Sequence, residues 1–232
     1  MRTSRRSGQL LLAFSLSLVP AAAQSWTQLF PAASPGGRRT HAMVYDWARQ
    51  RAVLFGGRDA TNQNLGDTWE WDGQTWTRMT PAASPPARWY HGMVYDLARK
   101  RTVLFGGDGG GVLNDTWEWD GANWTRRTPA ASPTPRYRHA MAYDMVRQRV
   151  VMFGGNPGSN PVLNDTWEWD GTNWVRMNPA RSPSIRISAI MAYDMARGKT
   201  ILHGGYDWSA NGERTDTWEW DGANWTELKP VT

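Results

Sequence analysis

Cysteine is absent from this sequence of 232 residues, and histidine occurs only four times. The lack of cysteine excludes disulfides, thiolate metal sites, a nucleophilic cysteine and cysteine-derived cofactors. After the first 23 residues no apolar run approaches the roughly 20 residues that span a bilayer, so we expect no membrane insertion of the mature chain. The formal net charge of +5 includes three arginines in that first segment, which leaves 23 basic against 21 acidic residues, a net of +2. This balance excludes nucleic acid as a partner on electrostatic grounds.

The first 23 residues have the three parts of a secretory signal peptide. Arg2, Arg5 and Arg6 form a basic region, Leu10 to Val19 form a short apolar core, and Pro20 precedes three small residues. The pattern predicts cleavage after position 23 and a mature chain, residues 24–232, that is secreted or periplasmic, outside the cytoplasm in either case. Because an exported chain without disulfides has no covalent cross-links, side-chain packing must stabilise its fold.

Tryptophan is abundant, with sixteen residues, and most of them recur at a fixed period. Gly-Gly pairs preceded by apolar residues begin at positions 56, 106, 154 and 204, at spacings of 50, 48 and 50. The string Asp-Thr-Trp-Glu-Trp-Asp-Gly begins at positions 67, 115, 165 and 216. A period near fifty residues, with four strand-like runs in each repeat, predicts a β-propeller.

Each repeat contains four segments that favour strands, which in the first repeat are His41–Tyr45, Ala52–Phe55, Thr68–Trp71 and Trp76–Met79. The second segment is apolar throughout, as is typical of a strand covered on both faces. Alternation along the third puts its two Trp on one face and Thr and Glu on the other. The Asp-Gly pairs between the third and fourth segments predict tight hairpins, so each repeat should form an antiparallel meander.

The Tyr-Asp before each Gly-Gly pair and the two spaced Trp after it resemble the Kelch family of β-propellers over essentially all of the mature chain. The resemblance implies an all-β fold with four complete four-stranded antiparallel blades, at about 38–80, 88–128, 136–178 and 186–229. A surplus N-terminal strand at 25–29 mimics a fourth strand through Trp26. Kelch propellers usually close with more blades, so a small closed ring, an open arc that dimerises and a fragment of a longer product all stay open.

Residues that recur in every repeat are interpreted as architectural, because a binding site normally needs a unique combination of groups. On this basis Glu70 and its copies are expected to face solvent, and Arg38 and its copies to mark the start of each blade. His41 and its two copies share one register, but Ala189 replaces them in the fourth repeat, so we expect packing roles and assign no metal. The paired Trp are expected to pack between blades.

Length varies only between each Gly-Gly pair and the following Asp, and variable loops on a rigid scaffold are where binding residues concentrate. In the fourth repeat Trp208 lies outside the repeated pattern and His203 replaces a phenylalanine, although a terminal capping role would explain both equally well. The candidate ligand-binding residues are Arg58, Asp59, Asn62, Asn64, Asp108, Asn156, Asn160, His203, Tyr206, Asp207, Trp208, Asn211, Glu213 and Arg214.

No sequence signature of catalysis is present, and no catalytic residue or cofactor is assigned. The leading hypothesis is an exported, non-enzymatic module that binds a protein or a glycan through the variable loops, as the Kelch resemblance implies. One alternative is a carbohydrate-active enzyme similar to sialic-acid mutarotase, since galactose-oxidase-like chemistry needs a Tyr–Cys cofactor that this chain cannot form. The other is a structural surface component, a homo-oligomer assembled through open blades.

Overall fold

The structure is a computed structural model that describes residues 26–208, 210 and 212–229. The predicted signal peptide and candidate residue Asn211 lie outside the described residues. The chain divides into one unit that ends at Phe30 and another that begins at Pro31. The described residues form strands, turns and bends, which confirms the all-β prediction. No helix in this part of the chain could cross a membrane.

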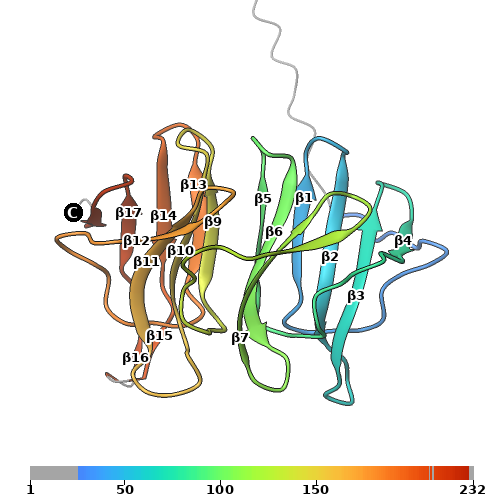
Figure 1. The fold of residues 1–232 in the computed structure, drawn as a ribbon, viewed down its shortest axis with the longest axis horizontal. Coiled ribbons are helices and arrows are strands. Elements are labelled where there is room, and N and C mark those ends of the chain that lie inside the picture. The colour runs from blue at the N-terminus through green and yellow to red at the C-terminus, as the bar shows by residue number, and fades with distance from the viewer. Residues whose placement is uncertain (1–25, 209, 211, 230–232) are drawn as a thin grey trace, which may run out of the picture. The chain divides into compact units, whose positions relative to one another are not determined.

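The second unit contains four four-stranded antiparallel sheets, each built from strands in chain order (Figure 1). The chain segment that connects β14 and β17 of the fourth sheet forms a short two-stranded sheet. The repeated order is consistent with a β-propeller-like arrangement. The strands are β1 (Ala42–Asp46), β2 (Arg51–Arg58), β3 (Asn64–Trp71) and β4 (Trp76–Met79) in the first sheet; β5 (Gly92–Asp96), β6 (Arg101–Asp108), β7 (Val112–Trp119) and β8 (Trp124–Arg127) in the second; β9 (Ala140–Asp144), β10 (Arg149–Gly155), β11 (Leu163–Trp169) and β12 (Trp174–Met177) in the third; β13 (Ile190–Asp194), β14 (Lys199–His203), β17 (Thr217–Trp220) and β18 (Trp225–Leu228) in the fourth; and β15 (Tyr206–Asp207) and β16 (Gly212–Glu213) in the short sheet.

The Gly-Gly pairs lie where the register between the second and third strands shifts in the first three sheets. In the second sheet Gly106 and Gly107 have φ of +64° and +99°, a region that side chains disfavour. A Cβ at Gly106 would lie 2.5 Å from the Arg136 carbonyl oxygen, and one at Gly107 would lie 2.8 Å from the His91 Cβ. Glycine is required here because segments leading into the second and third sheets pass directly against this backbone.

A buried arginine anchors the segment that leads into each sheet. The Arg88 guanidinium donates to both carboxylate oxygens of Asp115, at 2.6 and 2.8 Å, and to the Gly106 carbonyl oxygen at 2.9 Å. Burial raises the pKa of Asp115, but the hydrogen bonds and charge of Arg88 outweigh it and hold that pKa below its usual value. The recurring arginine therefore does more than mark the start of a blade. The equivalent pairs are Arg38–Asp67, Arg136–Asp165 and Arg186–Asp216.

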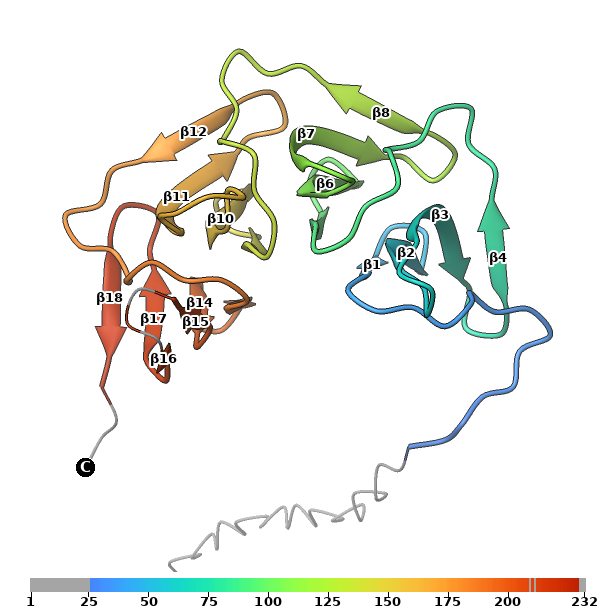
Figure 2. The ribbon, with the colours of Figure 1, turned by 90° about the horizontal axis from the view of Figure 1, so that it is seen from below.

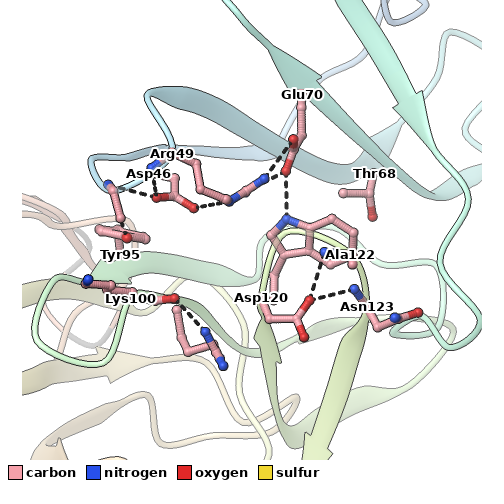
Figure 3. A network of polar contacts seen from close by, with 12 residues as sticks. Asp46, Arg49, Thr68, Glu70, Tyr95, Lys100, Asp120, Ala122 and Asn123 are labelled. Carbon is pink, nitrogen blue, oxygen red and sulfur yellow. Dashed lines mark hydrogen bonds and ion pairs between the residues drawn. The ribbon is translucent and has the colours of Figure 1, made fainter.

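Neighbouring sheets are joined by indole N–H groups that donate to the preceding sheet. Trp124 Nε1 donates to Thr68 Oγ1 at 2.9 Å, and Trp119 Nε1 donates to Glu70 Oε1 at 2.8 Å. Figure 3 shows that Arg49 binds the same Glu70 carboxylate. The expectation that Glu70 faces solvent is wrong, because the next sheet covers that face and buries the side chain. The predicted packing of paired Trp between blades is confirmed. The equivalent bonds are Trp174–Thr116, Trp169–Glu118, Trp225–Thr166 and Trp220–Glu168.

Within the second unit the sheets follow one another along an open arc, with their fourth strands on the outer side (Figure 2). Inner strands contact each other in the order β1, β5, β9 and β13. At the two ends the inner strands are uncovered: Met43 on β1 is 56% exposed and Ile190 on β13 is 73% exposed, whereas their counterparts Met93 and Ala140 are 8% and 5% exposed. The four described sheets therefore do not close into a ring.

The predicted surplus strand at 25–29 is not formed over residues 26–29. Each of the four sheets already has a fourth strand of its own, and a strand without a partner ladder is unstable in water. Similarity of the local sequence to a fourth strand was therefore insufficient to make one.

Candidate functional site

The variable loops and the segments that connect the sheets lie at the same edge of the four sheets, which we call the loop rim (residues 37–41, 58–64, 87–91, 108–112, 135–139, 156–162, 185–189, 204–208, 210 and 212–216). In Figure 1 the loops between β2 and β3 and between β10 and β11 project at the lower end. This common end is the one that the meander predicts. Isolated β-bridges tie each loop to its connecting segment, at Arg39–Arg58, Trp89–Asp108, Tyr137–Asn156 and Ile187–Tyr206.

Three of the predicted site residues form turns in their own loops. The Asp59 carboxylate accepts from the backbone N–H of Thr61 at 2.9 Å, and Asp108 and Asn156 accept likewise from the residue two positions on, at 2.9 and 2.7 Å. Asn156 is also buried. A backbone hydrogen bond from Gln63, supported by the Thr61 hydroxyl, holds the pKa of Asp59 below its usual value. These side chains therefore shape the loops, as Asp and Asn commonly do in turns.

The other predicted residues of the first loop lie together on the loop rim. Arg58 Nε donates to Asn64 Oδ1 at 2.8 Å, and its guanidinium lies 3.7 Å from the ring centroid of Trp89. Arg39 donates to the side-chain oxygen of Asn62. Arg58, Asp59 and the connecting segment border a hollow of about 240 Å³. The structure thus brings the predicted group together, but its members largely satisfy one another.

In the fourth loop Asp207 and Arg214 hold the backbone in place. The Asp207 carboxylate is buried and accepts from the Arg214 guanidinium and from the backbone N–H of Ala210. Tyr206 and Glu213 are paired in register on β15 and β16. This part of the predicted site is therefore a small folded hairpin that supports the residues around it.

His203 directly precedes the loop rim and belongs to the fourth sheet itself. It is the last residue of β14, its ring is exposed at the open end of the fourth sheet, and its Nδ1 lies 2.9 Å from Thr217 Oγ1. The sequence signalled this position correctly as a break in the repeat. The break lies on the exposed face of the fourth sheet, where the His203 ring contacts Thr217.

Two predicted residues from different loops, Asn160 and Trp208, border one hollow of about 280 Å³ on the loop rim. Pro161, Val162 and Ile185 complete its lining. The indole of Trp208 is 44% exposed, although large aromatic side chains are usually well buried in a folded protein. An exposed ring beside an amide and three apolar side chains can bind a ligand that has both an apolar face and hydrogen-bonding groups.

A second cluster on the loop rim was missed by the sequence reasoning. The Arg138 guanidinium lies 4.2 Å from the ring centroid of Tyr90 and donates to its hydroxyl at 3.1 Å. Tyr90 in turn packs against Trp89, with ring centroids 4.5 Å apart, and against Tyr137. The available signal was that the two residues after each recurring arginine differ in every repeat, while the arginine itself is constant and a histidine follows the pair in three of the four repeats.

The edge of the sheets opposite the loop rim also carries an unpredicted feature. Exposed apolar residues occupy the turns after the first strands: Trp47, Leu97, Met145 and Met195. Beside it, residues of all four inner strands line a hollow of about 320 Å³. Its lining consists of Tyr, Met, Val, Ala, Leu and Trp side chains, a set that offers no carboxylate or imidazole for acid–base chemistry.

The histidines of the first strands have the expected packing role. His91 and His139 are buried, and their rings lie edge-on to Phe55 and Phe105 with centroids 5.6 Å apart in each pair. Their ring nitrogens have no hydrogen-bond partner among the described residues. Within the same part of the chain, no group of three or more His, Asp or Glu side chains is placed to hold a metal ion.

A scan against protein-family models finds no match to this chain, and a search of curated proteins finds no significant relative. The candidate site therefore depends on the geometry of the loop rim.

Proposed function

We propose that this protein is an exported, non-enzymatic Kelch-type propeller of four blades that binds a protein or a glycan through its loop rim. The observation that carries the proposal is the hollow in which Trp208 and Asn160, from different loops, converge. Two further features support it: the four-stranded sheets follow one another in a propeller-like order, and side chains on the loop rim differ from repeat to repeat.

The chemistry of this hollow suits a small amphipathic group. The Trp208 ring offers a flat apolar surface, Val162 and Ile185 extend it, and the Asn160 amide can donate and accept hydrogen bonds. A volume of about 280 Å³ is at the lower limit of small-molecule sites. It matches one sugar ring, whose C–H face stacks on indole, or one side chain of a protein ligand.

Contacts beyond the hollow would extend along the loop rim toward the first three sheets. There the guanidinium groups of Arg58 and Arg138 lie over the rings of Trp89 and Tyr90, so positive charge and aromatic surface occur together. Such a surface favours ligands that carry carboxylate or sulfate groups beside apolar faces. Acidic glycans and acidic peptides both fit this description.

The test is a glycan and protein binding screen, followed by affinity measurements with two tryptophan variants. Trp208→Ala should weaken binding of a recovered ligand at least ~10-fold, because an exposed aromatic anchor at a contact centre carries much of the affinity. Trp47→Ala is the matched control, since this ring is 67% exposed at the edge of the sheets opposite the loop rim. The substitution should change affinity less than ~2-fold. A ligand that binds both variants as tightly as the parent would overturn the proposal.

Export is tested separately, by N-terminal sequencing of the protein recovered from outside the cytoplasm of an expressing cell. Cleavage after Ala23 should give a chain that begins at Gln24. An uncleaved chain retained in the cytoplasm would contradict this part of the proposal without touching the binding site.

A further inference from the structure

Every interior junction between two sheets joins two different faces. The face directed toward the preceding sheet presents a Tyr and two Trp as donors, and we call it the donor face. The face directed toward the following sheet presents an Asp, a Thr and a Glu, and we call it the acceptor face. At the first junction Tyr95 bonds to Asp46, while Trp119 and Trp124 donate to Glu70 and Thr68. The two Trp bonds recur at the second and third junctions.

Among the described residues no sheet precedes the donor face of the first sheet. Trp71 and Trp76 are only half-buried, whereas the six equivalent Trp of the other sheets are at most 2% exposed. The two indole N–H groups make no hydrogen bond to any described residue, although their rings pack together 5.5 Å apart. Tyr45 and Met43 on the same face are 43% and 56% exposed. This end of the arc therefore presents three unused donors within an apolar surface.

The acceptor face of the fourth sheet is the complementary half. The Glu219 side chain is 22% exposed, against 2–7% for its counterparts in the first three sheets, and Asp194 is 28% exposed, against 0–4%. Thr217 and Leu228 border a hollow of about 530 Å³, and Ile190 is exposed on the inner strand. No described sheet follows to cover this surface.

We propose that the donor face of one copy of this chain binds the acceptor face of a second copy, head to tail, in the geometry of an interior junction. Trp71 then donates to Glu219 and Trp76 to Thr217. Tyr45 bonds to Asp194, as Tyr95 does to Asp46. The inference rests on the fold alone and does not depend on ligand binding at the loop rim.

On the acceptor face His203 replaces the phenylalanine of the other repeats, and this replacement is compatible with the proposed contact. At interior junctions a phenylalanine lies edge-on to the second Trp of the next sheet, as Phe55 does to Trp124 with centroids 5.3 Å apart. His203 supplies an aromatic ring at the equivalent position. The Thr217 hydroxyl that pairs with His203 Nδ1 retains a lone pair for an indole N–H. A second copy is the favoured occupant because it brings all three donors at the spacing that this face already matches.

A contact of this type joins unlike faces, so copies associate in a closed ring or an open chain. Two single substitutions block one face each: Met43→Lys on the donor face and Ile190→Lys on the acceptor face. Each buries an unpaired charge at the contact and should raise the dissociation constant ~100-fold or more. Val146→Lys is the matched control, because Val146 is exposed by the same 73% as Ile190 but lies on a turn of the third sheet.

The measurement is molar mass in solution by light scattering and sedimentation, over a range of protein concentrations, with circular dichroism to verify that each variant is folded. The parent and Val146→Lys should assemble, while each blocked variant alone should stay monomeric. An equimolar mixture of the two blocked variants should form a complex of two chains and grow no further, because only one pair of intact faces is left. A parent chain that is monomeric at all concentrations, or a blocked variant that still assembles by itself, would overturn the proposal.

Discussion

The buried histidines predict that this protein loses stability well above the pH at which its carboxylates titrate. Burial, followed by the charge of a neighbouring arginine, lowers the pKa of His91 and that of His139 to about 3. The arginines are Arg88 and Arg136, whose own carboxylate partners offset only part of this effect. Both imidazoles therefore stay neutral in the folded protein while those of the unfolded chain protonate near pH 6.5.

The magnitude follows from proton linkage. Because the folded-state pKa lies below the unfolded value, the unfolded chain binds more protons as the pH falls, and the contribution to stability present above pH 6.5 is progressively lost. Between pH 7 and pH 5 each histidine should lower the free energy of unfolding by about 2 kcal/mol, and the pair by about 4 kcal/mol. This is a large part of the ~5–15 kcal/mol by which most domains are stable.

The assay is urea unfolding followed by tryptophan fluorescence at several values between pH 7 and pH 5. His139→Leu should halve the pH-dependent loss, whatever its effect on stability at pH 7, since it removes one of the two buried titrating groups. His203→Leu is the control, because that ring is already exposed in the folded protein. A parent loss of less than ~1 kcal/mol, or a full loss in His139→Leu, would refute the reasoning.

Two further predictions concern the junctions between sheets and the anchors of the connecting segments. Thr116→Val removes the acceptor for Trp174 Nε1 and leaves a buried donor unpaired, so urea unfolding should show a loss of ~1–3 kcal/mol. Thr217→Val should change the free energy of unfolding by less than ~0.5 kcal/mol in dilute solution, because no described Trp donates to that hydroxyl, whose partner is the exposed His203 ring. Arg136→Met leaves the Asp165 carboxylate with no cation in a site where both side chains are largely buried, and thermal and urea unfolding should show a loss of ~3–5 kcal/mol. Equal losses at the two threonines, or a neutral arginine substitution, would contradict these assignments.

Much of the fold was predictable because the repeat encodes it locally. The fourth-strand segment Trp76–Met79 has the bounds of β4, and the Asp-Gly hairpins join the third and fourth strands as expected. These features depend on residue alternation and turn chemistry, which act over a few positions. Agreement of four copies then identified the order of strands without any information on tertiary contacts.

What the sequence could not specify is which surfaces meet. Alternation places Glu70 opposite the two Trp of its strand, but only the neighbouring sheet decides that this face is buried. For the same reason Asn156 and Asp207 were expected to face a ligand and instead hold their own loops. The convergence of Asn160 with Trp208 joins residues almost fifty positions apart, and no local signal marks such a pair.

The repeat also distinguishes surfaces that are available for binding from surfaces whose side chains already contact an adjoining sheet. In the interior of the arc Thr68, Glu70 and their copies in the second and third sheets accept hydrogen bonds from Trp side chains of the adjoining sheet, so a substitution there acts on stability first. Two regions lie outside this pattern: the loop rim, where Trp208 is exposed beside Asn160, and the end faces, where Trp71 and Glu219 lack the partners of their counterparts.

Since head-to-tail copies would present their loop rims on one side, assembly would multiply weak single contacts into avidity for a repetitive ligand such as a polysaccharide. A block at Ile190 should then weaken binding of a polymer while leaving the affinity for its monomeric unit intact, a difference that distinguishes coupling between the two surfaces from independent roles.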